Sequence, residues 1–214
     1  MRLVPGRPVR GARAGAEAVA VDVGLSVPDD RIDSGWMSGA RRLPSPNASD
    51  RPAGCAADLL VVHNISLPPG EFGNGCVERL FCNLLDCSEH PWFDRLRGLE
   101  VSAHLLIARD GRCTQFVPFH RRAWHAGASA FEGRADCNDF SIGIELEGTD
   151  ELPYSEAQYA RLCRVTRALM REYPAITIGR IVGHSDIAPG RKTDPGPSFD
   201  WQTLRVLLGR PTTT

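Results

Sequence analysis

Apolar and polar residues follow two strand-like patterns along this chain. Residues 59–62 form an uninterrupted apolar run after a Pro- and Gly-containing region, which predicts a central buried strand. Residues 140–146 instead alternate apolar side chains with Ser141, Gly143 and Glu145. Because successive side chains of a strand point to opposite faces, this alternation predicts a half-buried strand.

Two further segments complete the predicted sheet. Residues 101–108 and 113–117 are rich in apolar side chains and flank an Asp110-Gly111 pair. Asp-Gly between two such runs is a strong hairpin signal, because both residues tolerate the backbone angles of a tight turn. Residues 178–182 have the composition of another strand.

The helical pattern is clearest after Ser155, which forms a capping box with Gln158. The apolar stripe behind this box ends before Pro174 and consists of Leu162, Val165, Leu169, Met170 and Tyr173. A second stripe predicts a helix at about residues 76–86 and consists of Val77, Leu80, Phe81, Leu84 and Leu85. Asp200 is a candidate cap for a last helix, with Trp201, Leu204, Leu207 and Leu208 facing inward.

These elements predict a single α/β domain with a central mixed β-sheet flanked by helices. The composition becomes domain-like from about Ser34, so we expect the domain to span residues 34–209, followed by a tail at 210–214. Residues 1–33 form a Gly-, Ala- and Arg-rich extension that we expect to be poorly ordered. Glu17 and Asp22 interrupt its apolar stretch, so no export signal is expected.

Composition narrows the possible classes of protein. With 42% hydrophobic and 24% charged residues, the chain has the profile of a soluble globular protein. Its net charge of −1 gives no general case for binding nucleic acid or an anionic membrane. No apolar stretch approaches the roughly 18–20 residues of a membrane-spanning helix. Seven cysteines, an odd number without a CxxC pair, favour free thiols in a reducing cytosol.

The best candidates for catalytic and metal-binding residues lie in the loop at 181–197, IVGHSDIAPGRKTDPGP, and at the end of the first apolar run. His63, His184 and Asp194 supply two imidazoles and one carboxylate, which is the ligand count of a catalytic zinc site with water in the fourth position. Lys192 would place a positive charge beside that water. This combination suggests metal-assisted hydrolysis of a carbonyl compound.

Each of these residues also has a simpler interpretation. A histidine at a strand end, such as His63, is more often a satisfied structural residue than a ligand. Glu145 fits a solvated carboxylate on an exposed strand face as well as it fits a catalytic base. Glu147 shares its position in the alternation, so the pattern does not choose between the two.

Several blocks of sequence together resemble the AmpD family. They are VVHNISLPPGEFG, VSAHLLI, AWHAG, CNDFSIGIELEGTD and GHSDIAPGRKTDPGPSFDW, and the resemblance covers about residues 35–209. Members of this family are cytosolic, zinc-dependent N-acetylmuramyl-L-alanine amidases specific for 1,6-anhydro-muropeptides. Their fold is related to that of T7-type lysozyme and of peptidoglycan recognition proteins, so the resemblance implies an amidase-like α/β domain.

The resemblance assigns roles residue by residue. It makes His63, His184 and Asp194 the ligands of one Zn²⁺ per chain. It places the catalytic residues at Glu145, rather than Glu147, and at Lys192. Glu145 would take a proton from the zinc-bound water and deliver it to the leaving amine, while Lys192 and zinc stabilise the oxyanion.

Other residues in these blocks are candidates for the surroundings of the site. Asn64, Trp92 and His125 are interpreted as substrate-binding, although a tryptophan such as Trp92 or Trp124 is more often part of a core. His104, like His125, is expected behind the metal ligands or in the pocket rather than on the metal. His90 and His120 are expected at the surface.

Two positions depart from the family pattern. Glu100 and Asp136 stand where some relatives carry arginine, which leaves the preference for the stem peptide open. The implied substrates are small soluble muropeptides, and we expect a cytoplasmic monomer with no nucleic-acid or membrane partner. The implied function is cell-wall recycling, with an indirect effect on β-lactamase induction. The alternatives are an amidase acting on polymeric peptidoglycan and a muropeptide-binding protein without activity.

Overall fold

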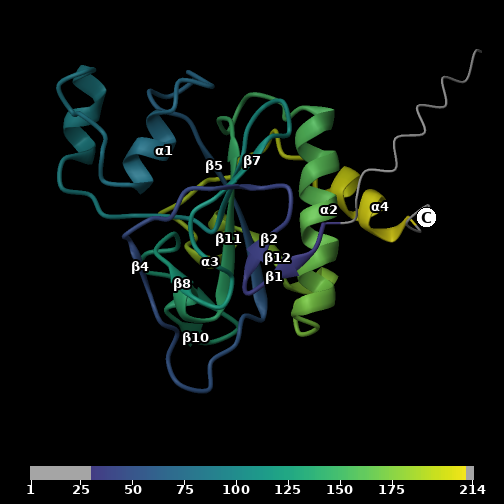
Figure 1. Ribbon diagram of the computed structural model, residues 1–214. Coiled ribbons are helices and arrows are strands. Elements are labelled where there is room, and N and C mark those ends of the chain that lie inside the picture. Colours follow the sequence, from purple (N-terminus) through teal and green to yellow (C-terminus); the bar gives the residue numbers. More distant parts are fainter. Residues whose placement is uncertain (1–29, 211–214) are drawn as a thin grey trace, which may run out of the picture.

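The computed structural model describes residues 30–210 (Figure 1). A six-stranded sheet forms its centre, and only the β6–β7 pair is antiparallel among neighbours of this sheet. In spatial order the strands are β12 (Ile181–Gly183), β5 (Leu59–Ile65), β11 (Ser141–Glu147), β6 (Leu105–Ile107), β7 (Cys113–Gln115) and β3 (Arg41–Arg42). The predicted mixed sheet is confirmed, and so is the hairpin at Asp110-Gly111.

Short elements surround this sheet. Three two-stranded ribbons pair β1 (Ile32–Asp33) with β2 (Trp36–Met37), β4 (Ala48–Ser49) with β8 (Arg122–Ala123), and β9 (Ala130–Phe131) with β10 (Arg134–Ala135). The α-helices are α1 (Cys76–Phe81), α2 (Glu156–Glu172), α3 (His184–Ile187) and α4 (Trp201–Gly209). Three 3₁₀ turns lie at Pro91–Leu96, Cys137–Asp139 and Ile178–Arg180. None of the helices between residues 30 and 210 is long and apolar enough to cross a membrane.

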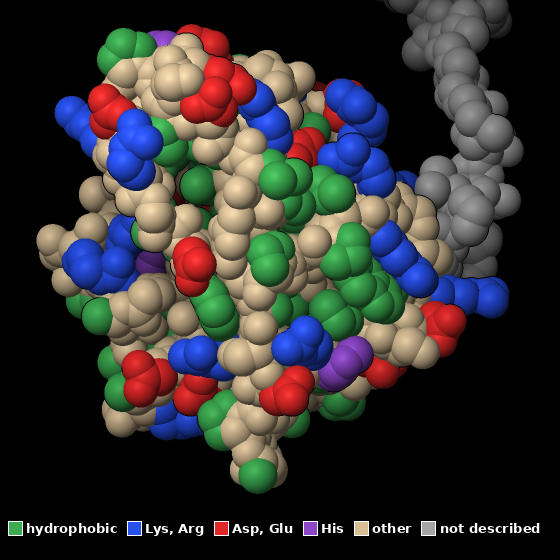
Figure 2. All heavy atoms as spheres, turned by 60° about the vertical axis from the view of Figure 1, so that its left-hand side comes forward, with side chains coloured by type: hydrophobic (Ala, Val, Ile, Leu, Met, Phe, Trp, Pro, Cys, Tyr) green, Lys and Arg blue, Asp and Glu red, His purple; other side chains and the backbone are tan. Residues whose placement is uncertain are grey.

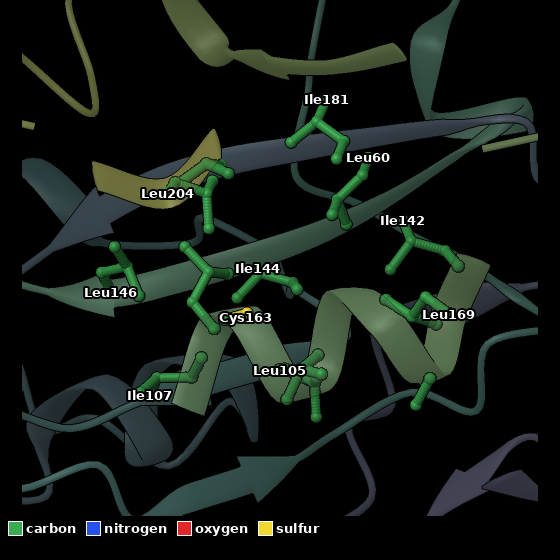
Figure 3. Close-up of a cluster of buried hydrophobic side chains, with 14 of the residues drawn as sticks. Leu60, Leu105, Ile107, Ile142, Ile144, Leu146, Cys163, Leu169, Ile181 and Leu204 are labelled. Carbon is green, nitrogen blue, oxygen red and sulfur yellow. The ribbon is translucent and has the colours of Figure 1, made fainter. Parts of the chain in front are cut away.

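Helices α2 and α4 lie together on one side of the sheet, and α1 lies on the other (Figure 1). The face toward α2 carries Ile142, Ile144 and Leu146 of β11, which point toward Leu169 and Cys163 of the helix (Figure 3). Burying aliphatic side chains of this size contributes about 1.5–3 kcal/mol each. The capping box of Ser155 and Gln158 is present at the start of α2, and Asp200 caps α4, as predicted.

The opposite face of the central strands carries the functional residues. Strand β11 pairs with β5 in parallel, with Ser141 opposite Leu59 and Glu145 opposite His63. Every residue of β11 is buried, so the prediction of a half-buried strand was wrong. The polar positions of β11 are buried because Ala126, Cys137 and Ile187 also pack on this side of the sheet.

Two other predicted elements need correction. The helix predicted at 76–86 ends at Phe81, because Asn83 adopts a positive φ of 58° and turns the chain. Leu84, which continued the apolar stripe in sequence, is 72% exposed. Residues 178–180 form a 3₁₀ turn rather than the start of a strand, so β12 begins at Ile181, where it pairs with Leu60 of β5.

The described fold includes residues 30–33, which were expected to belong to the extension. Asp30 is 4% exposed, and its carboxylate forms an ion pair of 3.1 Å with Arg161 of α2. Residues 30–33 therefore belong to the domain. The rest of the predicted extension and the tail after Arg210 lie outside the described residues. Acidic and basic side chains are interspersed over the face seen in Figure 2, in keeping with the small net charge.

Candidate active site

A cleft of about 680 Å³ opens at the carboxyl ends of β5, β11 and β12. Parallel strands of an α/β sheet bring the residues that follow them to one edge, so this is where segments distant in sequence meet. All eight site residues predicted from the sequence line this cleft: His63, Asn64, Trp92, His125, Glu145, His184, Lys192 and Asp194.

Three of them bring one atom each to a common point. The Nδ1 atoms of His63 and His184 lie 2.9 Å apart, and each lies 3.0 Å from Oδ2 of Asp194. Among the described residues, no other group of three or more His, Cys, Asp or Glu side chains has this convergence. The donor atoms of a tetrahedral zinc site are separated by about 3.3–3.5 Å, so only a small widening would fit the ion.

The orientation of the two imidazoles suits a cation at this point. Burial lowers the pKa of His63 to about 4, so the ring is neutral at physiological pH. Nε2 of His184 lies 3.1 Å from the carbonyl oxygen of Ala126, to which it donates, so Nδ1 is the ring nitrogen that faces Asp194. Two ring nitrogens and one carboxylate oxygen that face one another at this spacing fit a divalent metal ion.

The loop after β12 places Asp194 and Lys192 with backbone bonds. Ser185 N donates to the carbonyl oxygen of Asp194 at 3.0 Å, and Lys192 N donates to that of Ala188 at 3.0 Å. The hydroxyl of Tyr154 donates to the carbonyl oxygen of Pro195 at 2.8 Å and holds the next turn of the loop. Lys192 is the single lysine among 25 lysine and arginine residues, and its exposed side chain lines the cleft.

Burial and hydrogen bonding distinguish Glu145 from Glu147. Glu147 accepts hydrogen bonds from the backbone N–H groups of Gly73 and Arg109, so both of its oxygens are engaged. Glu145 is 8% exposed, and its Oε2 has no partner among the described residues. Burial, together with the nearby Asp194, raises the pKa of Glu145 well above its usual range. The interpretation of Glu145 as a solvated carboxylate was therefore wrong.

The remaining predicted residues differ in their contacts. Nδ2 of Asn64 already donates to Asp150 at 2.7 Å, a partner that the sequence pattern did not indicate. Trp92 lines the cleft beside Trp124. His125 lies beside His63, with Nδ1 at 2.9 Å from Nε2 of that ring.

Five other predicted positions lie outside the cleft lining. His104 is fully buried and accepts a hydrogen bond at Nδ1 from Gly143 N, so it supports the sheet rather than the pocket. Glu100 and Asp136 are exposed and do not line the cleft. His120 is exposed as expected, whereas His90 is partly buried and caps the turn at Pro91–Leu96.

A mixed sheet that presents two histidines, one aspartate and a buried glutamate at one edge has the donor set of a mononuclear metallohydrolase. Comparison with known proteins identifies the family within this class. Residues 53–197 match the family model Amidase_2, described as N-acetylmuramoyl-L-alanine amidase. The chain belongs to this amidase family.

Similar proteins cover nearly the whole described domain. The chain is 57% identical to the 1,6-anhydro-N-acetylmuramyl-L-alanine amidase AmpD of Escherichia coli K12 over 182 residues, which are 85% of this chain and 99% of that relative. It is also 57% identical to AmpD of Citrobacter freundii, over 83% of this chain and 94% of the relative. A crystal structure of a selenomethionine AmpD derivative matches with a TM-score of 0.81 at 57% identity, covering 83% of this chain and 98% of that one.

Proposed function

We propose that this protein is a zinc-dependent amidase that hydrolyses the bond between the lactyl group of 1,6-anhydro-N-acetylmuramic acid and L-Ala of the stem peptide. The observation that carries the proposal is the meeting of three metal-ligand atoms beside an unpartnered buried carboxylate. The identity to relatives named for this activity supports the substrate assignment.

His63, His184 and Asp194 would hold the metal ion. When bound, zinc lowers the pKa of a coordinated water toward about 7 and polarises the substrate carbonyl. Two neutral imidazoles and one carboxylate leave a net positive charge at the site, which suits both effects.

Glu145 is suited to move the proton. It lies opposite His63 on the neighbouring strand, and its free Oε2 is available to accept a proton from water. Burial raises the pKa of its carboxyl group, which makes the carboxylate a stronger base toward water, and the proton it takes up is the one it gives to the leaving L-Ala nitrogen. One carboxyl group thus acts as base and then as acid, and the proton balance closes within one turnover.

Lys192 is suited to stabilise the negative charge that develops on the carbonyl oxygen. Its side chain donates no hydrogen bond among residues 30–210, so the ammonium group is available to substrate. It lines the same cleft as Glu145 and His63. Removing one donor of this kind typically costs about 10²–10³ in rate.

The wider role extends the activity for which the relatives are named. We propose that the substrates are small soluble anhydro-muropeptides, that the enzyme acts as a monomer in cytoplasmic cell-wall recycling, and that it affects β-lactamase induction indirectly by removing these fragments. The cleft volume of about 680 Å³ suits a single sugar with part of its peptide.

The test is mass spectrometry of the protein incubated with 1,6-anhydro-N-acetylmuramyl-tripeptide, with and without a chelator. We expect chelator-sensitive release of free tripeptide and anhydro-N-acetylmuramic acid, and its loss in a zinc-loaded Glu145→Gln control. Intact substrate with one zinc per chain would refute the proposal in favour of a binding protein. Faster release of peptide from intact sacculi than from the soluble fragment would indicate the amidase of polymeric peptidoglycan.

A further inference from the structure

A chain of three hydrogen bonds runs from His63 away from the metal ligands. Nε2 of His63 lies 2.9 Å from Nδ1 of His125, and Nε2 of His125 lies 3.2 Å from the hydroxyl of Ser141. That hydroxyl lies 2.6 Å from the carbonyl oxygen of Cys137. The chain therefore begins at a proposed metal ligand and ends at a backbone acceptor.

The two ends of this hydrogen-bond chain fix the direction of its bonds. A carbonyl oxygen only accepts, so the Ser141 hydroxyl donates its one hydrogen to Cys137 and must accept from Nε2–H of His125. With its proton on Nε2, the neutral form of His125 offers a lone pair at Nδ1, 2.9 Å from Nε2 of His63. At the other end, Nδ1 of His63 faces Nδ1 of His184 and Oδ2 of Asp194, where a metal ligand needs a lone pair, so His63 carries its proton on Nε2 and donates it to His125.

The second proposed histidine ligand, His184, is oriented by Ala126, the residue that follows His125. Nε2–H of His184 donates to the carbonyl oxygen of Ala126, as described above. The partners of both ligand imidazoles thus come from His125 and Ala126. The side-chain oxygen of Asn138 accepts from both of their backbone N–H groups, at 3.0 and 2.8 Å, and holds this pair of residues in place.

We infer that His125 and Ser141 are positioning residues that select the metal-binding tautomer of His63, and that His125 does not serve primarily to bind substrate. The inference rests on the metal site of the proposed function. Partners of this kind fix the ring orientation and basicity of a ligand, and their loss typically weakens metal binding about 10–100-fold.

Ser141→Ala tests the relay, because it removes the acceptor for His125 without touching a ligand. Without that acceptor, His125 can move its proton to Nδ1, which forces His63 to carry a proton on Nδ1 and turns it away from metal binding. Ser102→Ala is the matched control. Ser102 is equally buried, donates to the Asn47 carbonyl at 2.6 Å and accepts from Trp124 N at 3.1 Å, so its hydroxyl is hydrogen-bonded to residues other than histidine.

Two measurements test whether Ser141 and His125 set the tautomer of His63. Competition with a chromophoric chelator gives the zinc affinity, and we expect it to fall about 10–100-fold in Ser141→Ala and to stay within about twofold in Ser102→Ala. NMR of ¹⁵N-labelled imidazoles in the metal-free protein identifies the protonated nitrogen of each ring. We expect Nε2–H at His63, His125 and His184 in the wild type, and a proton on Nδ1 of His63 in an appreciable fraction of Ser141→Ala molecules.

The outcomes separate this inference from the proposed function. If wild-type protein binds no zinc but shows the three Nε2–H groups, the relay stands and the proposed metal chemistry fails. If zinc binds equally well to wild type and Ser141→Ala, the relay is refuted and the metal site stands. Observation of Nδ1–H on His63 in the wild type would overturn the inference without any variant, so it is decisive even if Ser141→Ala does not fold.

Discussion

Replacing Gly143 by alanine is the most informative single change outside the metal ligands. Gly143 lies at the centre of β11, and the imidazole of His125 lies flat against it. A Cβ atom added there would lie within 2.7 Å of three atoms of that ring, Cγ, Nδ1 and Cδ2. No rotation of a methyl group relieves such contacts, so the ring has to move away from His63.

The size of the effect follows from two opposing contributions. Glycine in a strand is less favourable than alanine by roughly 0.5–1 kcal/mol, and the φ of Gly143 is not in the left-handed region, so alanine alone would stabilise the fold. Forcing an extra carbon into a packed interior typically destabilises by about 1–3 kcal/mol. We expect the clash to dominate, with a net destabilisation of up to about 2.5 kcal/mol and a fall in Tm of up to about 10 °C for a domain of this size.

The assay is equilibrium unfolding in urea of metal-free protein, for wild type, Gly143→Ala, His125→Ala and the double variant. Removing the ring removes the clash, so Gly143→Ala should stabilise the His125→Ala protein slightly. The gain from replacing glycine is the same in both backgrounds and cancels, so the double-mutant cycle should give a coupling energy equal to the clash, about 1–3 kcal/mol, between the two positions. Gly209→Ala is the control, because a Cβ atom at Gly209 meets nothing within 4 Å.

One result would refute this reasoning. If Gly143→Ala were as stable as the wild type and showed no coupling to His125→Ala, the ring could not lie against the strand. The relay from Ser141 to His63 would then lose its geometric basis as well. If Gly143→Ala were equally destabilising with and without the His125 ring, so that the coupling energy were zero, the cause would be strain within β11 itself.

Three further predictions concern the site and its surroundings. Lys192→Ala should keep one zinc per chain and lose turnover about 10²–10³-fold, and wild-type turnover in the zinc-loaded variant would remove Lys192 from the mechanism. His184→Ala should lose both zinc and activity, as measured by metal analysis and substrate release, and a metal-replete active variant would exclude His184 as a ligand. Burial lowers the pKa of His104 to about 3, so below about pH 6.5 the unfolded chain takes up a proton there that the native protein does not. The free energy of unfolding therefore decreases as the pH is lowered, by up to about 1.4 kcal/mol per pH unit. In His104→Gln the dependence of unfolding free energy on pH between 6.5 and 5 should be flatter by that amount, and an unchanged slope would contradict a neutral buried His104.

Local sequence determined the elements whose signals are local. The capping box at Ser155 and the apolar stripe behind it define α2, and Asp110-Gly111 defines the β6–β7 hairpin. The uninterrupted apolar run at residues 59–62 indicated a strand covered on both faces, and β5 is such a strand. In each case the physical cause lies within a few residues of chain, so the pattern alone is sufficient.

Hydrophobic patterns failed where a covering segment or a turn of the backbone decides the environment of a residue. The alternation at 140–146 predicts an exposed face, but residues from other parts of the chain cover it, and small Ser141 and Gly143 leave room for them. The stripe continuing to Leu84 predicts a longer helix, but the turn at Asn83 ends it. Neither covering segments nor a change of backbone direction is encoded in hydrophobic periodicity.

The sequence by itself determined the chemistry available to this protein: two histidines, an aspartate, a glutamate on a strand and one lysine, in blocks that resemble a known family. Only the tertiary structure decided how they act. Pairing of β5 with β11 places Glu145 opposite His63, and pairing of β5 with β12 brings His184 to the same edge. The protonation of each ligand depends on partners such as Ser141 and Ala126, because hydrogen-bond direction is a property of atoms in contact and not of residues in order.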